Sequence, residues 1–199
     1  RRVMPIMHEI SHLPGGHKPL NFVHKLADGS TRHVQTYAGP IEIYGDKLML
    51  CIVHDITEQK RLEEQLEHAA HHDAMTGLLN RRQFYHITEP GQMQHLAIAQ
   101  DYSLLLIDTD RFKHINDLYG HSKGDEVLCA LARTLESCAR KGDLVFRWGG
   151  EEFVLLLPRT PLDTALSLAE TIRVSVAKVS ISGLPRFTVS IGVAHHEGN

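Results

Sequence analysis

Two short acidic segments of this chain could together hold a divalent metal ion. Asp108 and Asp110 follow an apolar run, and Glu151 and Glu152 follow a pair of glycines. Carboxylate oxygens are the ligands that Mg²⁺ prefers, and Mg²⁺ leaves positions open for phosphate oxygens. Metal ions bound in this way activate an attacking hydroxyl and neutralise a leaving pyrophosphate. The segments therefore point to metal-dependent chemistry on a nucleotide.

The positions of the acids predict that the two segments meet. The glycine pair separates two strand-like runs, residues 144–148 and 153–157, and so predicts a tight hairpin turn. If the strand that ends at Asp108 pairs with this hairpin, all the acids share one cleft. Taken singly, each segment has another explanation: the aspartates could cap a helix, and acids after a turn are usually solvated.

Three polar residues follow the first acidic segment. Lys113 could stabilise phosphate charge, or it could be a surface lysine. Asn116 and Asp125 supply an amide and a carboxylate, which together can bind the edge of a guanine base. The same pair could instead serve helix capping and turn formation near Gly120 and Gly124. Sequence physics alone leaves both explanations open.

The composition limits the class of partner. Among 199 residues, 21 lysines and arginines face 24 aspartates and glutamates, a formal net charge of −3. This balance gives no basic field for a nucleic-acid polymer. Cys51, Cys129 and Cys138 form no CxxC pair, so we expect reduced, buried thiols in a cytoplasmic protein. No apolar run is long enough to span a bilayer. The chain begins with Arg1 rather than methionine, so we expect a fragment, and an upstream membrane anchor or sensor stays open.

The 15 histidines raise the question of a histidine metal site. His8 and His12 are four residues apart, but the Pro-Gly-Gly at residues 14–16 ends any helix that carries them. The adjacent pairs at 71–72 and 195–196 would point in different directions on a helix. We therefore expect solvated surface histidines rather than metal ligands.

The chain divides into three regions by pattern. Residues 1–55 alternate as short strands, with a hairpin turn at Asp28-Gly29, and predict an antiparallel meander. Residues 56–72 predict a helix with Thr57 as its N-cap. Residues 73–199 alternate between strands and helices in the order β-α-β-β-α-β, which is typical of a ferredoxin-like α+β sheet with helices on one face.

A narrow apolar stripe on the middle helix consists of Leu62, Leu66 and Ala69. The stripe fits a solvated linker helix, but its narrowness on a charged helix favours a parallel coiled coil that joins two protomers. In the last region, Thr160 and Pro161 predict the start of a helix as N-cap and first residue. Lys141 and Gly142 predict the end of another.

Four blocks of the last region resemble the GGDEF family of diguanylate cyclases. They are DAMTGLLNRR at residues 73–82, DTDRFKHIND at 108–117, GHSKGD at 120–125 and RWGGEEF at 147–153. The resemblance implies conversion of two GTP molecules to cyclic di-GMP and two pyrophosphates, with Mg²⁺ or Mn²⁺ as cofactor. It also implies a fold similar to the palm of adenylyl cyclases and polymerases.

The resemblance assigns roles to residues of this chain. Asp108, the Thr109 carbonyl, Glu151 and Glu152 would bind metal, and Glu151 would also help to deprotonate the 3′-hydroxyl. Lys113 would stabilise the transition state at the α-phosphate. The guanine and ribose pocket would be lined by Asn116, His121 and Asp125.

The family's product-inhibition site is an RxxD segment, and Arg140 and Asp143 stand at the matching distance before the glycine pair. Arginine pairs with phosphate or a guanine edge, and aspartate with guanine N–H groups. Many family members carry an arginine where this chain has Thr171, which puts the second half of that site in doubt. Family members also continue past residue 193 into a helix with basic residues that hold the triphosphate, and we expect that element to be missing here.

The first region resembles the C-terminal half of a PAS sensor domain, whose last strand runs into DITEQK at residues 55–60. The GGDEF resemblance implies a homodimer in which two GGDEF domains meet face to face, and the sensor would control their alignment through the linker helix. A non-catalytic module that binds GTP or cyclic di-GMP and regulates a downstream domain is the alternative. The intact acids at Asp108, Glu151 and Glu152 favour the enzyme.

Overall fold

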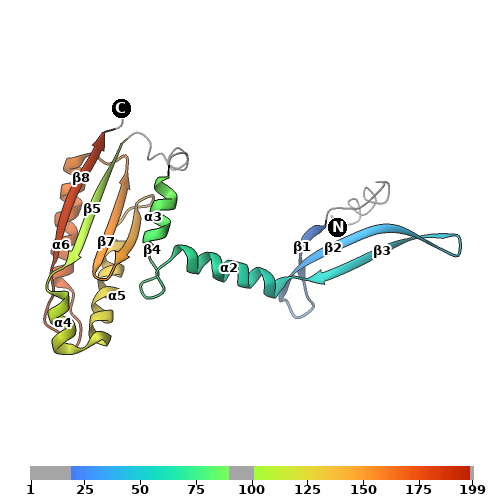
Figure 1. The fold of residues 1–199 in the computed structure, drawn as a ribbon, viewed down its shortest axis with the longest axis horizontal. Helices are drawn as coiled ribbons and strands as arrows, with labels where there is room; N and C mark the ends of the chain where they lie inside the picture. Colours follow the sequence, from blue (N-terminus) through green and yellow to red (C-terminus); the bar gives the residue numbers. More distant parts are fainter. Residues whose placement is uncertain (1–18, 90–100, 198–199) are drawn as a thin grey trace. The chain divides into compact units, whose positions relative to one another are not determined.

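The computed structural model describes residues 19–89 and 101–197, which are drawn in colour in Figure 1. The chain forms two compact units, and the division between them falls within helix α2, between Glu67 and His68. Across the described ranges, no helix combines the length and apolar character that a membrane crossing requires.

The first unit contains a three-stranded antiparallel sheet in the order β1-β2-β3. Its strands are β1 (Leu20–Lys25), β2 (Thr31–Ile43) and β3 (Asp46–Asp55). The expected meander is found. Every residue of β3 is exposed. This includes Cys51, so the expectation of a buried thiol is wrong there, and Cys129 and Cys138 are only partly buried.

Helix α2 (Thr57–His71) has no buried residue. Leu62 and Leu66 of the apolar stripe are 49% and 72% exposed. Thr57 is not the N-cap that we expected, because its hydroxyl accepts a hydrogen bond from the backbone N–H of His33 at 2.9 Å. The backbone N–H of Thr57 instead donates to the Asp55 carboxylate at 2.9 Å. A contact with strand β2 therefore takes the place of the local cap.

The second unit contains a five-stranded mixed sheet in the order β4-β6-β7-β5-β8. Its strands are β4 (Leu79–Asn80), β5 (Asp101–Thr109), β6 (Leu144–Gly149), β7 (Glu152–Pro158) and β8 (Val189–Glu197). All neighbouring strands run antiparallel except β4 and β6, which run parallel. The last four strands have the ferredoxin-like arrangement that we expected, and β4 extends it at one edge.

Helices cover both faces of this sheet, as Figure 1 shows. They are α3 (Arg81–Thr88), α4 (Phe112–Tyr119), α5 (His121–Cys138) and α6 (Leu162–Lys178). The larger core joins α4, α5 and α6 to inward residues such as Leu155. The smaller core joins Ile87 of α3 to Phe146, Val154 and Leu156 on the other face. The expectation of helices on one face is therefore wrong for α3, because alternate residues of β6 and β7 are apolar on both sides.

Two expected helix ends differ from the structure. Pro161 is the N-cap of α6, and the Thr160 hydroxyl donates to the Pro158 carbonyl at 3.1 Å instead of capping the helix. Helix α5 already ends at Cys138, before Lys141 and Gly142. In both places a residue near the helix end donates a hydrogen bond to the carbonyl of Pro158 at the end of β7, and this contact replaces the expected helix cap.

Candidate active site

The glycine turn lies beside the strand that carries Asp108. Gly150 has a φ of 51°, a left-handed conformation that glycine adopts without strain, and it joins β6 to β7 in a tight turn. Strand β7 then pairs with β5 in the register that sets Asp108 opposite Glu152. The Thr109 hydroxyl also donates to the Glu151 carbonyl at 3.4 Å. The acidic segments therefore lie close together, as the turn predicted.

The carboxyl group of Asp108 is electrostatically strained. Partial burial raises its pKa, and the negative charges of Glu151 and Asp110 raise it further. Like charges gathered at one strand end disfavour ionisation in the absence of a cation. A divalent ion would relieve this repulsion, so the donor chemistry of the site fits Mg²⁺. Within residues 19–89 and 101–197, however, no three His, Cys, Asp or Glu side chains are already arranged as a metal site.

Asp110 is held by side-chain hydrogen bonds to one of the first residues of β8 and to the residue just before that strand. Its two carboxylate oxygens accept hydrogen bonds from the Thr188 hydroxyl at 2.5 Å and the Ser190 hydroxyl at 2.6 Å. Its backbone N–H donates to the Thr188 carbonyl at 3.0 Å. Asp110 therefore fixes the start of β8 against the end of β5.

A pocket of about 680 Å³ opens between this strand end and helix α4. Asp108 and Asp110 line it together with basic side chains from two segments, Arg111 and His114 around the start of α4 and Arg186 just before β8. Lys113 is exposed on α4 and is not among the residues that line the pocket.

The three residues expected around guanine gather where α4 meets α5. Asn116 is on α4, and His121 and Asp125 are exposed and one helical turn apart on α5. The side-chain oxygen of Asn116 is buried and has no hydrogen-bond partner within the described residues. It lies against Gly124, where an added Cβ would be only 1.9 Å from it. Because the Asn116 side-chain oxygen caps nothing, the arrangement favours ligand binding over the capping explanation.

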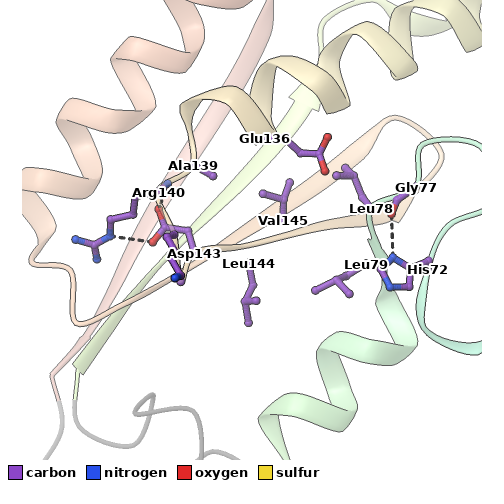
Figure 2. Close-up of a pocket in the computed structure, with 12 residues that line it drawn as sticks. His72, Gly77, Leu78, Leu79, Glu136, Ala139, Arg140, Asp143, Leu144 and Val145 are labelled. Atoms are coloured by element: carbon purple, nitrogen blue, oxygen red, sulfur yellow. Dashed lines mark hydrogen bonds and ion pairs between the residues drawn. The ribbon is translucent and has the colours of Figure 1, made fainter. Parts of the chain in front are cut away.

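The RxxD segment forms one wall of a second pocket, of about 390 Å³, shown in Figure 2. The opposite wall comes from His72 and residues 77–79, and His72 contacts the Gly77 carbonyl at 2.9 Å. Asp143 accepts hydrogen bonds from the Arg140 backbone N–H at 2.9 Å and its guanidinium at 3.0 Å. The Asp143 side chain is only 2% exposed.

The Arg140 guanidinium makes two further contacts, with the Pro158 carbonyl at 2.9 Å and with the Thr160 hydroxyl. Thr171 lies exposed on α6, and its hydroxyl donates to the Ser167 carbonyl at 2.9 Å. It lines neither of the two pockets.

The family model that describes the diguanylate cyclase GGDEF domain matches residues 70–199. The chain belongs to the GGDEF family.

Related GGDEF proteins agree with this assignment. A diguanylate cyclase of Vibrio cholerae is 43% identical over 119 residues, which are 60% of this chain and 37% of that protein. The chain spans 36% to 50% of the length of the first curated relatives that it matches.

Solved GGDEF structures agree with the fold. The coiled coil and GGDEF domain of DgcB from Caulobacter crescentus, in complex with c-di-GMP, has a TM-score of 0.62 and 29% identity, covering 71% of this chain and 78% of that one. The active GGEEF domain of a Vibrio cholerae diguanylate cyclase has a TM-score of 0.55 and 37% identity, covering 61% and 80%. That domain shares the Glu-Glu form of the motif found here.

Sequence reasoning missed several contacts around the candidate site. Nothing in the spacing showed that Arg147 would bind Asp73, or that Asp110 would bind Thr188 and Ser190, because these partners are 74 to 80 residues apart. Arg186 lies outside all four motif blocks. The strand order, once known, would have placed β8 beside β5 and so brought Arg186 to the pocket.

Proposed function

We propose that this chain is the catalytic part of a diguanylate cyclase, which condenses two GTP molecules into cyclic di-GMP and releases two pyrophosphates. One observation carries the proposal: Asp108 is in register with Glu152, and the charge of Glu151 raises the pKa of Asp108. Acids held together against their own repulsion at a strand end are suited to cation binding. The 43% identity to a diguanylate cyclase supports the choice of reaction.

The metal ions would be Mg²⁺ or Mn²⁺. Asp108, Glu151 and Glu152 would bind them through carboxylate oxygens, and Thr109 would bind through its backbone carbonyl. When bound, such ions favour ionisation of the attacking hydroxyl and neutralise the charge of the leaving pyrophosphate.

The protein's own groups would handle the proton and the phosphate charge. Glu151 would accept the proton of the 3′-hydroxyl of one GTP. The freed oxygen then forms a bond to the α-phosphorus of the second GTP, and the bond from that phosphorus to pyrophosphate breaks. The same exchange in the other direction closes the ring. Lys113 would approach from α4 to stabilise the charge on the α-phosphate.

The base would be held at the corner between α4 and α5. The unpaired side-chain oxygen of Asn116 can accept a hydrogen bond from a guanine N–H group, and the carboxylate of Asp125 can accept the pair of guanine N–H donors. His121 lies one turn before Asp125 and would contact the ribose side of the pocket.

Two copies of the chain would have to meet, because each active site holds one GTP and the reaction needs two. The exposed stripe of Leu62, Leu66 and Ala69 on α2 would form a parallel coiled coil that brings two domains face to face. We propose that residues 1–55 are part of a PAS sensor, residues 56–72 the signalling linker and residues 73–199 the cyclase domain. Changes in the sensor would then alter the helix pair and so the alignment of the two sites.

Product inhibition would act at Arg140 and Asp143. The pocket beside them offers a cationic group and apolar walls to a guanine nucleotide. Binding requires Arg140 to exchange its contacts with Pro158 and Thr160 for contacts with the product.

Release of pyrophosphate from GTP in the presence of Mg²⁺ tests the function. We expect turnover by the protein that contains this chain, and at least about a hundredfold loss in Glu151→Gln, since a lost proton acceptor costs that much. Binding of GTP or cyclic di-GMP without pyrophosphate release would establish the non-catalytic module instead. Replacing GTP with ATP tests whether the enzyme is another cyclase of the palm type.

A further inference from the structure

We propose that Arg111, His114 and Arg186 bind the β- and γ-phosphates of the nucleotide, with Arg186 as the main contact. The inference rests on the proposed function, since it concerns the substrate of the same site. It adds a phosphate-binding surface made of side chains from two segments that line the pocket beside Asp108.

The first observation is the chemistry of the pocket wall. Three basic side chains line a pocket that also contains the metal-binding candidate Asp108. For none of the three does the described part of the chain show a side-chain hydrogen bond or an ion pair. Arg111, His114 and Arg186 are all exposed, so their cationic or N–H groups are available to a ligand. A pocket lined by both acids and basic groups suits a metal-bound polyphosphate.

The second observation is that the backbone of Arg186 is anchored although its side chain is exposed. Phe187, the next residue, is 4% exposed and belongs to the main core. Thr188 then exchanges two hydrogen bonds with Asp110, at 2.5 and 3.0 Å. Pro185 on the other side restricts its own φ. Arg186 is therefore held at the pocket wall and loses little backbone freedom when a ligand binds.

The segment that carries Arg111 and His114 is also fixed. Arg111 has a φ of 56°, and its carbonyl accepts hydrogen bonds from His114 at 2.9 Å and Ile115 at 3.2 Å. Phe112 and Ile115 are both 8% exposed and anchor this turn to the core. A left-handed backbone at a residue other than glycine is uncommon and is enriched at functional sites. The turn therefore fixes the backbone of Arg111 and His114 at the pocket that Arg186 also lines.

Size and charge select the ligand. A volume of about 680 Å³ is in the range of small-molecule sites. Arginine forms paired hydrogen bonds to the oxygens of a phosphate or a carboxylate group. A triphosphate presents several such groups in a row, whereas a carboxylate presents one. Two guanidinium groups oppose the charge of the two terminal phosphates, which GMP lacks, and the His114 ring offers a further polar contact. The surface therefore discriminates GTP from GMP.

Binding of 3′-deoxy-GTP and of GMP in the presence of Mg²⁺ tests the proposal, because neither compound can be turned over. In Arg186→Ala we expect about tenfold weaker binding of 3′-deoxy-GTP, the loss typical of a charged hydrogen bond, with GMP affinity unchanged. Arg186→Lys should recover part of the loss. Arg133→Ala, an exposed arginine of α5 outside both pockets, is the matched control. Thermal unfolding of each variant confirms that the fold is intact.

The outcomes separate this inference from the proposed function. If the wild-type protein binds no GTP analogue, the proposed function fails and this inference fails with it. If the wild-type protein binds it and Arg186→Ala binds within twofold of wild type, the inference alone is overturned. An equal loss of GMP affinity in Arg186→Ala would also overturn it, because that pattern means a general disturbance of the site.

Discussion

Arg147 binds both carboxylate oxygens of Asp73 through one guanidinium nitrogen, at 3.0 and 3.1 Å. The same guanidinium donates to the Gly150 carbonyl at 2.9 and 3.2 Å. Asp73 comes two residues after α2, and Gly150 directly precedes Glu151. The start of the second unit and the turn that carries the acids are therefore joined through a single side chain.

Loss of this link should destabilise the second unit. The two side chains are only 12% and 24% exposed, so Asp73→Asn leaves Arg147 partly buried without its counter-charge. We expect a cost of about 1–3 kcal/mol in the free energy of unfolding, measured by urea denaturation. Glu170→Gln breaks the exposed Arg173 pair of α6 and should have a much smaller effect. Equal effects of the two substitutions would contradict a special role for Arg147 and Asp73.

The same pair predicts a pH dependence. Burial acts to raise the pKa of Asp73, but hydrogen bonds from Thr76 and the charge of Arg147 outweigh it and hold the pKa below its usual value. A lowered pKa means that the ionised carboxylate stabilises the fold above the unfolded-state pKa, and that this stability is lost as the pH falls through the folded-state pKa. Wild type should therefore lose more stability on acidification below about pH 4 than Asp73→Asn does. Parallel pH profiles in urea denaturation would refute this.

Asp108→Asn should have the opposite effect on stability. The raised pKa of Asp108 means that its ionised form is disfavoured in the fold, so the charge destabilises the metal-free protein at neutral pH. Removing the charge should raise the melting temperature in a chelator at pH 7. The advantage should shrink as the pH falls and the wild-type carboxyl becomes protonated. The variant should also lose cyclase activity and the stabilisation that Mg²⁺ gives to wild type. A lower melting temperature at pH 7 would show that Asp108 makes an unrecognised structural contact.

Gly124 should be required for base binding rather than for folding. Alanine is normally favourable inside a helix, by about 1 kcal/mol over glycine. Here its Cβ would be 1.9 Å from the side-chain oxygen of Asn116, which can rotate away. We expect Gly124→Ala to fold and to bind GTP about tenfold more weakly, in the range of one lost hydrogen bond. Asn116→Ala should give a similar loss, and the double variant should be no worse than either. Additive losses would show that Gly124 acts independently of Asn116.

Sequence patterns predicted the local and the repeated features of this fold. The glycine turn and the strand-like runs of β6 and β7 follow from residue types alone, and β7 then pairs with β5 so that Glu152 lies beside Asp108. The two N-cap predictions failed because distant partners override the local signals. Thr57 binds His33, which is 24 residues away, and the Thr160 hydroxyl contacts Arg140, which is 20 residues away. A single sequence contains no direct signal for such pairs. The residues next to each partner in the sequence do not show which strands lie side by side in the fold.

The contact between Arg140 and Thr160 leads to a prediction about product inhibition. Arg140 is 57% exposed, yet its guanidinium is bound to Asp143, the Pro158 carbonyl and the Thr160 hydroxyl. A ligand that binds this arginine must compete with those contacts. Thr160→Val preserves the shape of a buried side chain but removes one competitor, so we expect severalfold tighter binding of cyclic di-GMP by calorimetry and inhibition at lower product concentration. Arg140→Ala should abolish that binding and leave initial turnover of GTP unchanged. Unaltered product affinity in Thr160→Val would mean that the product does not displace the Thr160 contact.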